Sequence, residues 1–152
     1  MSTAPNDRFK MLVAVHFVIY RDQKILLGLR QNTGWSDGLW HLIGGHVEEG
    51  EMITDAVIRE AREELGIEVN RKSLRLVHVR SILRPSHSRL HMFFHIEEWQ
   101  GQIENKEPDK NPKLNWFDVD SLPENTTEET KINLQDIRNN INYSEIVYNH
   151  ER

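Results

Sequence analysis

Hydrophobic and polar positions alternate along much of the chain in the manner of short β-strands. Runs rich in β-branched and aromatic residues, bounded by turn-forming residues, predict strands. The predicted strands cover residues 11–20, 24–30, 39–43, 74–83, 90–99 and 114–118. We expect the first two to form one hairpin, and the fourth and fifth to form another around Pro85. The pair Gly44-Gly45 is expected to break the third strand.

One stretch has the periodicity of a helix instead. Between residues 52 and 65 an apolar residue recurs every four positions with charged residues in between, which predicts an amphipathic helix. The recurring apolar residues are Ile53, Val57, Ala61 and Leu65. Gly66 suits the left-handed conformation that commonly ends a helix. A looser helical spacing over residues 126–148 predicts a second, C-terminal helix.

These elements predict an α/β (α+β) fold in which a mixed central sheet lies between helices. The polar stretch 101–113 contains two prolines and is expected to be a long surface loop, and such loops are often functional. No repeat, low-complexity tract or linker divides the 152 residues. We therefore expect a single domain spanning residues 1–152.

Composition excludes several classes of protein. No apolar run approaches the roughly 18 to 20 residues that a membrane span needs, and residues 1–10 lack a secretory signal, so a cytoplasmic location without membrane contact is expected. The net charge of −5 argues against an extended nucleic-acid surface. Because the chain has no cysteine, a catalytic metal must be bound by oxygen or imidazole. The oligomeric state is left open, with a homodimer as one alternative.

Three carboxylates share one face of the predicted helix. At about 100° per residue, Glu60, Glu63 and Glu64 fall within one sector of its surface. Like charges at this spacing repel one another, so a cation is expected among them. Oxygen ligands of this kind suit Mg²⁺, or Mn²⁺ as a substitute, together with phosphate oxygens and water. The alternative interpretation is a solvated acidic face without a ligand.

The stretch from Gly45 to Ile67 resembles the signature of the Nudix hydrolase family. The matching positions, at the family's spacing, are Gly45, Glu51, Arg59-Glu60, Ala61, Glu63-Glu64, Gly66 and Ile67. The similarity extends over residues 10–125, where the downstream part resembles MutT-like nucleotide pyrophosphohydrolases. One departure is Ile43, where family members commonly have proline. The implied fold is the Nudix α/β/α sandwich.

The resemblance implies Mg²⁺-dependent hydrolysis of a phosphoanhydride bond in a nucleoside diphosphate derivative. The favoured small-molecule substrate is a nucleoside triphosphate or deoxynucleoside triphosphate, cleaved to the monophosphate and diphosphate. The implied metal ligands are the carbonyl of Gly44 and the carboxylates of Glu60, Glu63 and Glu64. Arg59 would orient Glu51 through a charge-assisted hydrogen bond. Two alternatives remain: an ADP-ribose or nucleotide-sugar pyrophosphatase, and a Nudix-like module that binds nucleotides without cleaving them.

Residues outside this signature are further candidates for the site. Related enzymes often use one more carboxylate as metal ligand or general base, and Glu107 is the candidate, with Glu104 and Asp109 as competitors. Lys110 would screen phosphate charge. Trp35 is the candidate for stacking on a base. Asn125 is a candidate for contacting the base edge, because it lies where some MutT-like members read the base.

Overall fold

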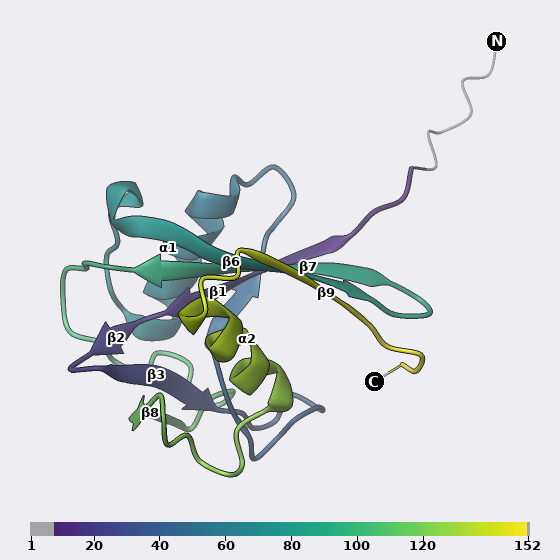
Figure 1. The fold of residues 1–152 in the computed structure, drawn as a ribbon. Coiled ribbons are helices and arrows are strands. Elements are labelled where there is room, and N and C mark those ends of the chain that lie inside the picture. Colours follow the sequence, from purple (N-terminus) through teal and green to yellow (C-terminus); the bar gives the residue numbers. More distant parts are fainter. Residues whose placement is uncertain (1–7, 152) are drawn as a thin grey trace.

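The computed structural model describes residues 8–151, which form two sheets and two helices (Figure 1). A five-stranded sheet has the strand order β5-β1-β7-β6-β9, and a four-stranded sheet pairs β3 with β2, β4 and β8. The elements are β1 (Leu12–Val18), β2 (Tyr20–Arg21), β3 (Lys24–Leu29), β4 (Trp40–His41), β5 (Gly44–His46), α1 (Ile53–Leu65), the 3₁₀ turn η1 (Arg71–Ser73), β6 (Leu74–Leu83), β7 (Ser88–Ile96), β8 (Lys113–Asp118), α2 (Glu128–Arg138) and β9 (Tyr143–Val147).

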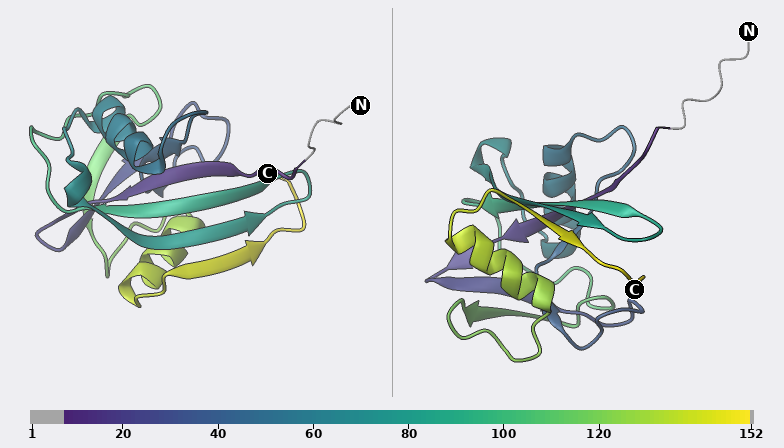
Figure 2. Two further views of the ribbon diagram at one scale, coloured as in Figure 1. Left: turned by 90° about the horizontal axis from the view of Figure 1, so that it is seen from above. Right: turned by 45° about the vertical axis from the view of Figure 1, so that its right-hand side comes forward.

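The larger sheet is mixed, as the sequence predicts. Strands β1 and β7 are parallel, as are β6 and β9, whereas β1–β5 and β6–β7 are antiparallel. The view from above shows β1, β7, β6 and β9 side by side (Figure 2). The predicted hairpin of β6 and β7 is confirmed.

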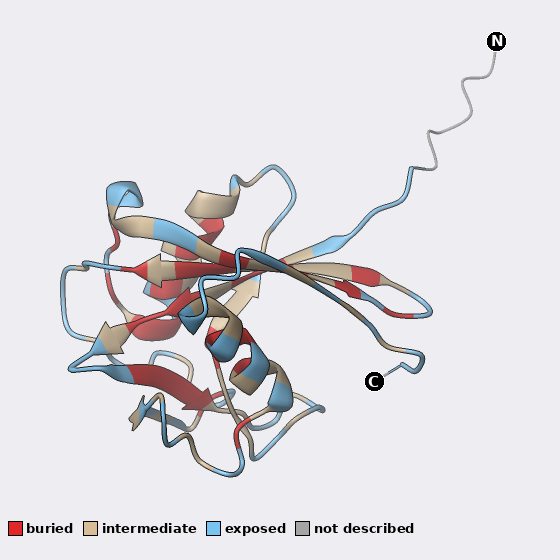
Figure 3. Cartoon of the chain, in the orientation of Figure 1, coloured by how far each residue is buried: buried red, intermediate tan, exposed pale blue. Residues whose placement is uncertain are grey.

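The two helices cover opposite faces of this sheet (Figure 1). Successive side chains of a strand point to opposite faces. In β1, Val15 and Phe17 therefore pack in the cluster that contains the apolar side of α1, whereas Val18 packs with Leu134 of α2. Buried residues accordingly line the inward surfaces of both helices and both sheets (Figure 3). The predicted arrangement of a mixed sheet between helices is confirmed.

The predicted C-terminal helix is wrong in its second half. Helix α2 ends at Arg138, and Asn140 adopts a left-handed conformation with φ of 55°. The chain then returns as β9, which pairs in parallel with β6 from Val79 opposite Tyr143 onward. Exposed and partly buried residues alternate along β9, which is the period of a strand and not that of a helix.

The predicted first hairpin is also only partly right. Residues 11–20 divide between the two sheets: β1 pairs with β5 and β7, and only Tyr20–Arg21 turns back onto β3. The third strand does end before Gly44-Gly45, since β4 stops at His41, but the two glycines themselves form part of edge strand β5 beside β1. A Cβ atom on Gly44 would lie 1.9 Å from the carbonyl oxygen of Val15, so only glycine permits this close approach.

Helix α1 and the loop after β7 are where the sequence predicts them. The helix runs from Ile53 to Leu65 and ends at Gly66, whose φ is 66°. The long loop is tied to this end of the helix, because the amides of Glu104 and Lys106 donate to the carbonyls of Leu65 and Glu64, at 2.9 and 3.0 Å. No helix within residues 8–151 is long and apolar enough to cross a bilayer.

Candidate active site

A cavity of about 500 Å³ lies where α1, β5, the sheet and α2 meet. Acidic side chains, most of them from α1 and the loop after β7, line one part of it, and aromatic, imidazole and uncharged α2 side chains line another. The acidic residues include Glu48, Glu60, Glu63, Glu64, Glu107 and Glu129, and the other residues include His16, Trp35, His41, His91, Phe93, Thr130 and Asn133. The cavity therefore combines a strongly acidic region with a region suited to a planar ring.

The side chain of Glu60 lies directly against the backbone of Gly45. A Cβ atom at Gly45 would come within 2.1 Å of Glu60 Oε1, so any larger residue would displace this carboxylate. Burial is the largest influence on Glu60 and raises its pKa. The glycine pair thus places a partly desolvated carboxylate beside main-chain atoms of β5.

Arg59 connects several of the acidic residues. Its Nε donates to Glu51 Oε1 at 2.7 Å, and its Nη1 donates to Glu60 Oε1 at 2.9 Å and to Glu63 Oε2 at 3.1 Å. Its Nη2 also donates to the carbonyl of His46 at 3.0 Å. The hydrogen bond from Arg59 lowers the pKa of Glu51. Arg59 therefore supplies part of the positive charge that offsets the carboxylates of α1.

Glu64 and Glu107 form the pair that Arg59 does not neutralise. Glu64 is 8% exposed, and burial, followed by the charge and hydrogen bond of Glu107, raises its pKa to about 8. Lys110 Nζ lies 2.8 Å from Glu107 Oε2, and this contact raises the pKa of Lys110. Asn111 Nδ2 donates to Glu64 Oε2 at 3.4 Å. Two carboxylates from distant parts of the sequence thus lie together at the edge of the cavity.

The donor atoms in this region fit a hard divalent cation. Glu60, Glu63, Glu64 and Glu107 all line the same cavity with carboxylates, and burial together with the neighbouring charge of Glu107 raises the pKa of Glu64. Within residues 8–151, no three acidic or histidine side chains converge into a cage for a metal ion. Mg²⁺ does not need such a cage, because it usually takes a few carboxylates together with water and substrate phosphates.

The structure brings two of the three predicted substrate-binding residues to the cavity. Trp35 is 42% exposed, and the guanidinium carbon of Arg30 lies 3.8 Å from its ring centroid. Lys110 also lines the cavity. Asn125 is not among the lining residues, and its Nδ2 donates at 3.0 Å to the carbonyl of Gly38. Its side chain thus holds the loop that carries Trp35.

The sequence alone did not reveal the histidines of the cavity. His16 Nε2 and His91 Nδ1 lie 3.2 Å apart, and the ring of His16 stacks on Phe93 with centroids 4.9 Å apart. Burial lowers the pKa of His16 well below 6.5 and the pKa of His91 to about 4, so both are neutral near pH 7. His41, whose pKa is also lowered to about 4 by burial, is hydrogen-bonded to Asn111 at 2.9 Å.

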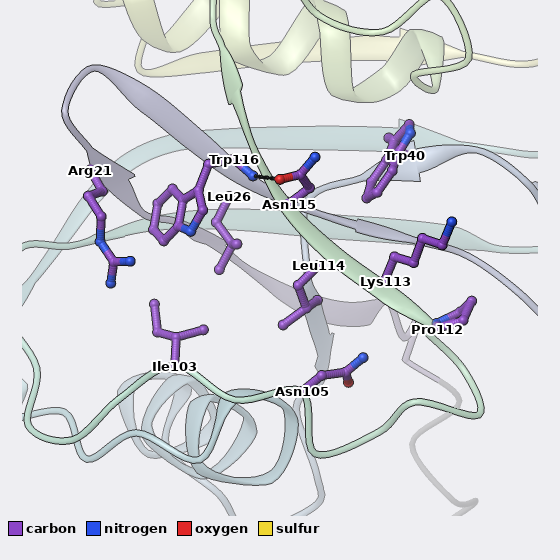
Figure 4. Close-up of a pocket in the computed structure, with 10 residues that line it drawn as sticks. All are labelled: Arg21, Leu26, Trp40, Ile103, Asn105, Pro112, Lys113, Leu114, Asn115 and Trp116. Atoms are coloured by element: carbon purple, nitrogen blue, oxygen red, sulfur yellow. Dashed lines mark hydrogen bonds between the residues drawn. The ribbon is translucent and has the colours of Figure 1, made fainter.

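A second hollow, of about 630 Å³, lies beside β3 and β8 (Figure 4). The guanidinium carbon of Arg21 stands 4.5 Å from the ring centroid of Trp116 at one side of it. Leu26, Ile103 and Leu114 form its apolar part. None of its lining residues is acidic, so it lacks the ligands that a metal-assisted reaction on phosphates requires.

Comparison with known proteins gives a consistent result. A family model described as the NUDIX domain matches residues 10–136. CTP pyrophosphohydrolase of Escherichia coli is 36% identical over 99 residues, which are 64% of this chain and 71% of that protein. ADP-ribose pyrophosphatase of Methanocaldococcus jannaschii is 34% identical over 120 residues, which are 79% of this chain and 69% of that protein.

Solved structures share the fold. The crystal structure of a MutT NUDIX hydrolase from Burkholderia pseudomallei superposes with a TM-score of 0.73 and 32% identity, covering 83% of this chain and 97% of that one. The sequence signature, the family model and the shared fold all cover the helix whose carboxylates line the cavity. The chain therefore belongs to the Nudix family and is a MutT-like Nudix hydrolase.

Proposed function

We propose that this hydrolase cleaves a nucleoside triphosphate or deoxynucleoside triphosphate to the monophosphate and diphosphate, in a reaction that depends on Mg²⁺. The observation that carries the proposal is the joining of two unlike regions in one cavity. The carboxylates of α1 and Glu107 suit a cation that binds phosphates. Trp35 and the neutral histidines suit a base.

In this proposal Glu60, Glu63, Glu64 and the carbonyl of Gly44 hold Mg²⁺. When bound, the ion polarises the phosphate and lowers the pKa of a water molecule. Arg59 holds Glu60 and Glu63 in position through its hydrogen bonds and ties them to Glu51.

Glu107 is the candidate general base. The oxygen of a water molecule attacks phosphorus, its proton passes to Glu107, and the bond to the bridging oxygen of the leaving diphosphate breaks. Lys110, 2.8 Å from Glu107, screens negative charge that develops on the phosphates. No covalent intermediate with the protein is required.

A second candidate substrate is ADP-ribose. It is favoured by the 34% identity to an ADP-ribose pyrophosphatase over 79% of this chain, a larger share than the CTP pyrophosphohydrolase covers. The same carboxylates would serve this reaction, because the bond that breaks is also a phosphoanhydride. The two candidates differ in what occupies the cavity beyond the diphosphate.

The test is incubation of the full chain with Mg²⁺ and a panel of nucleoside triphosphates, deoxynucleoside triphosphates, ADP-ribose and nucleotide sugars, with products separated by chromatography. The expected result is a monophosphate and diphosphate from one or a few triphosphates. Release of AMP and ribose 5-phosphate from ADP-ribose, with all triphosphates untouched, would select the second candidate. Release of orthophosphate alone would contradict both.

A further inference from the structure

A recess of about 210 Å³ opens beside the candidate active site, at the turn between β6 and β7. The two hollows share Trp35, Arg89, His91 and Glu129, so they are contiguous. The remaining wall of the recess consists of Gly34, Ile82, Arg84 and His87. A ligand in the main cavity can therefore extend into this recess.

The hairpin geometry explains why basic side chains gather there. The amide of Arg84 donates to the carbonyl of His87 at 3.0 Å, which closes the turn. Ile82 stands directly opposite Arg89 in the antiparallel ladder, so both side chains lie on the same face. Arg84 follows Ile82 by two residues and shares that face. Helix α2, which carries Glu129, covers this face of the sheet.

Three buried side-chain nitrogens at this recess, two of them guanidinium donors, have no hydrogen-bond partner in the described part of the chain. Arg84 Nη1, His87 Nε2 and Arg89 Nε are buried and have no hydrogen-bond partner among residues 8–151. Arg84 itself is only 7% exposed. Buried donors without an acceptor are costly and uncommon in folded proteins. Their concentration in one small recess indicates that a group rich in acceptors belongs there.

The charges around the recess leave one cation uncompensated. Arg84 Nη2 donates to Glu129 Oε1 at 3.5 Å, and His87 Nδ1 lies 3.5 Å from Glu151 Oε2. Arg89 forms no ion pair in the described part of the chain, although it faces the recess. The guanidinium of Arg89 together with the free Nη1 of Arg84 suits an oxyanion, because guanidinium donors match the oxygens of phosphate groups.

We propose that this recess binds a phosphate group carried by the substrate at the end remote from the bond that is cleaved. The position of the cleaved diphosphate, at the carboxylates of α1, rests on the proposed function. The phosphate-binding property itself rests only on the recess. This goes beyond the proposed function, because it extends the substrate class to nucleotides that bear a further phosphate away from the reacting diphosphate.

The first experiment is a calorimetric titration of inorganic phosphate into the full chain with a chelator present, so that no metal occupies the carboxylate cavity. The variant Arg84→Met removes the guanidinium but keeps an unbranched apolar side chain beside Tyr148, whose ring centroid lies 4.0 Å from the guanidinium carbon. We expect the affinity for phosphate to fall at least tenfold. Absence of saturable binding by the wild-type protein, or equal affinity in the variant, would overturn the proposal.

Two further variants make this test specific. Arg71→Met removes the same charge from an exposed position, where Arg71 pairs with Asp55, and should leave phosphate affinity within twofold of wild type. If Arg84→Met does not fold, His87→Ala replaces it, because the side chain of His87 is 28% exposed and lies in the turn. We expect at least a threefold loss of affinity in His87→Ala. Unchanged affinity in that variant would count against the recess as the binding site.

The second experiment identifies the source of the phosphate. Adenosine 5′-diphosphate and its 2′- and 3′-phosphorylated derivatives are titrated separately, again with chelator. At least one derivative should bind wild-type protein tenfold more tightly than the parent, and Arg84→Met should lose this gain. Equal affinities for all three, with inorganic phosphate still bound, would overturn the substrate-borne source and assign the recess to free phosphate. Since no turnover is measured, failure of the proposed hydrolysis does not affect either result.

Discussion

Glu64 is a buried carboxyl whose pKa lies well above the ordinary value. Its pKa of about 8 in the folded protein lies above the ordinary 4.5, so between these values the folded state binds more protons than the unfolded state. Its contribution therefore makes the unfolding free energy fall as pH rises through this window. The buried histidines have lowered pKa values and act in the opposite direction, but only below about pH 6.5. Above about pH 7, therefore, only Glu64 of these groups changes the unfolding free energy.

Urea denaturation in the presence of a chelator should reveal the contribution of Glu64 to the pH dependence of the unfolding free energy. Between pH 7 and pH 8 the unfolding free energy of the wild-type protein is expected to decrease, and that of Glu64→Gln to decrease less. Parallel curves for the two proteins would show that Glu64 is already ionised at pH 7.

The same substitution should remove most of the activity. We expect Glu64→Gln to lower kcat by at least about a hundredfold, or roughly 2.7 kcal/mol of barrier, because a proposed ligand is lost. Glu68→Gln is the matched control: Glu68 is exposed, pairs with Arg62 at 2.7 Å and lies outside the cavity, so its rate should stay within twofold of wild type. A Glu64→Gln variant with near-normal turnover would exclude Glu64 from the mechanism.

The residues that the sequence revealed share one helix, whose regular spacing sets their relative positions. Glu60, Glu63 and Glu64 could therefore be grouped without a structure. Asn111 could not be, because it reaches Glu64 and His41 across 47 and 70 positions of the sequence. The pairing of His16 with His91 depends on strands 75 positions apart, and nothing in the local pattern marks either residue.

At the level of elements, helix α2 is attached to β6 through a buried polar contact. Arg80 is 5% exposed, its Nε donates to Asn133 Oδ1 at 2.6 Å, and its Nη2 donates to Asp136 Oδ2 at 2.6 Å. We expect Arg80→Ala to lower the unfolding free energy by about 3 to 5 kcal/mol, because the partly buried carboxylate of Asp136 loses its guanidinium partner and keeps only His78, at 3.6 Å, beside it. Urea denaturation at pH 7 measures this loss.

The control for this prediction lies on the same strand. Arg75 pairs with Glu97 on the surface, and its side chain is 61% exposed. Its replacement by alanine should change stability by no more than about 1 kcal/mol. A similar small loss in Arg80→Ala would show that apolar packing alone holds α2 against the sheet.

Elements with their own periodicity were predictable, and elements defined by a distant partner were not. Helix α1 and strand β6 have strong local patterns and lie where the sequence predicts them. Strand β9 exists because β6 offers it an edge, and β5 exists because Gly44 can approach Val15. Neither partner is visible in the nearby sequence, so one segment was predicted as helix and the other as a break.

For the molecule as a whole, binding of Mg²⁺ should stabilise the fold. A ligand that binds only the native state stabilises it by RT ln(1 + c/Kd) at a free ligand concentration c, which is about 2.7 kcal/mol at a concentration a hundredfold above Kd. Thermal unfolding should therefore shift upward with Mg²⁺ in the wild-type protein and much less in a Glu63→Gln, Glu64→Gln double variant. Sodium chloride of equal ionic strength serves as the control. Equal shifts in both proteins would place the ion elsewhere.

The overall architecture could be predicted from the order of the elements, but the distribution of the strands between two sheets could not. A mixed sheet between helices was expected, whereas the separation of β1 from β2 at Ile19 into different sheets was not. The separation depends on the burial of Ile19, which is 1% exposed, in the core beneath α1. A run of apolar residues gives no indication of where the chain passes from one sheet to the next.

The main-chain hydrogen bonds from Glu104 and Lys106 to the end of α1 have a consequence for divergence among relatives. Because amides and carbonyls make the attachment, it is indifferent to the side chains that the loop carries. Residues facing the ligand can then change over generations while the loop keeps its anchorage beside Glu64. Such a scaffold lets substrate preference drift and leaves the proposed metal-binding carboxylates where they are.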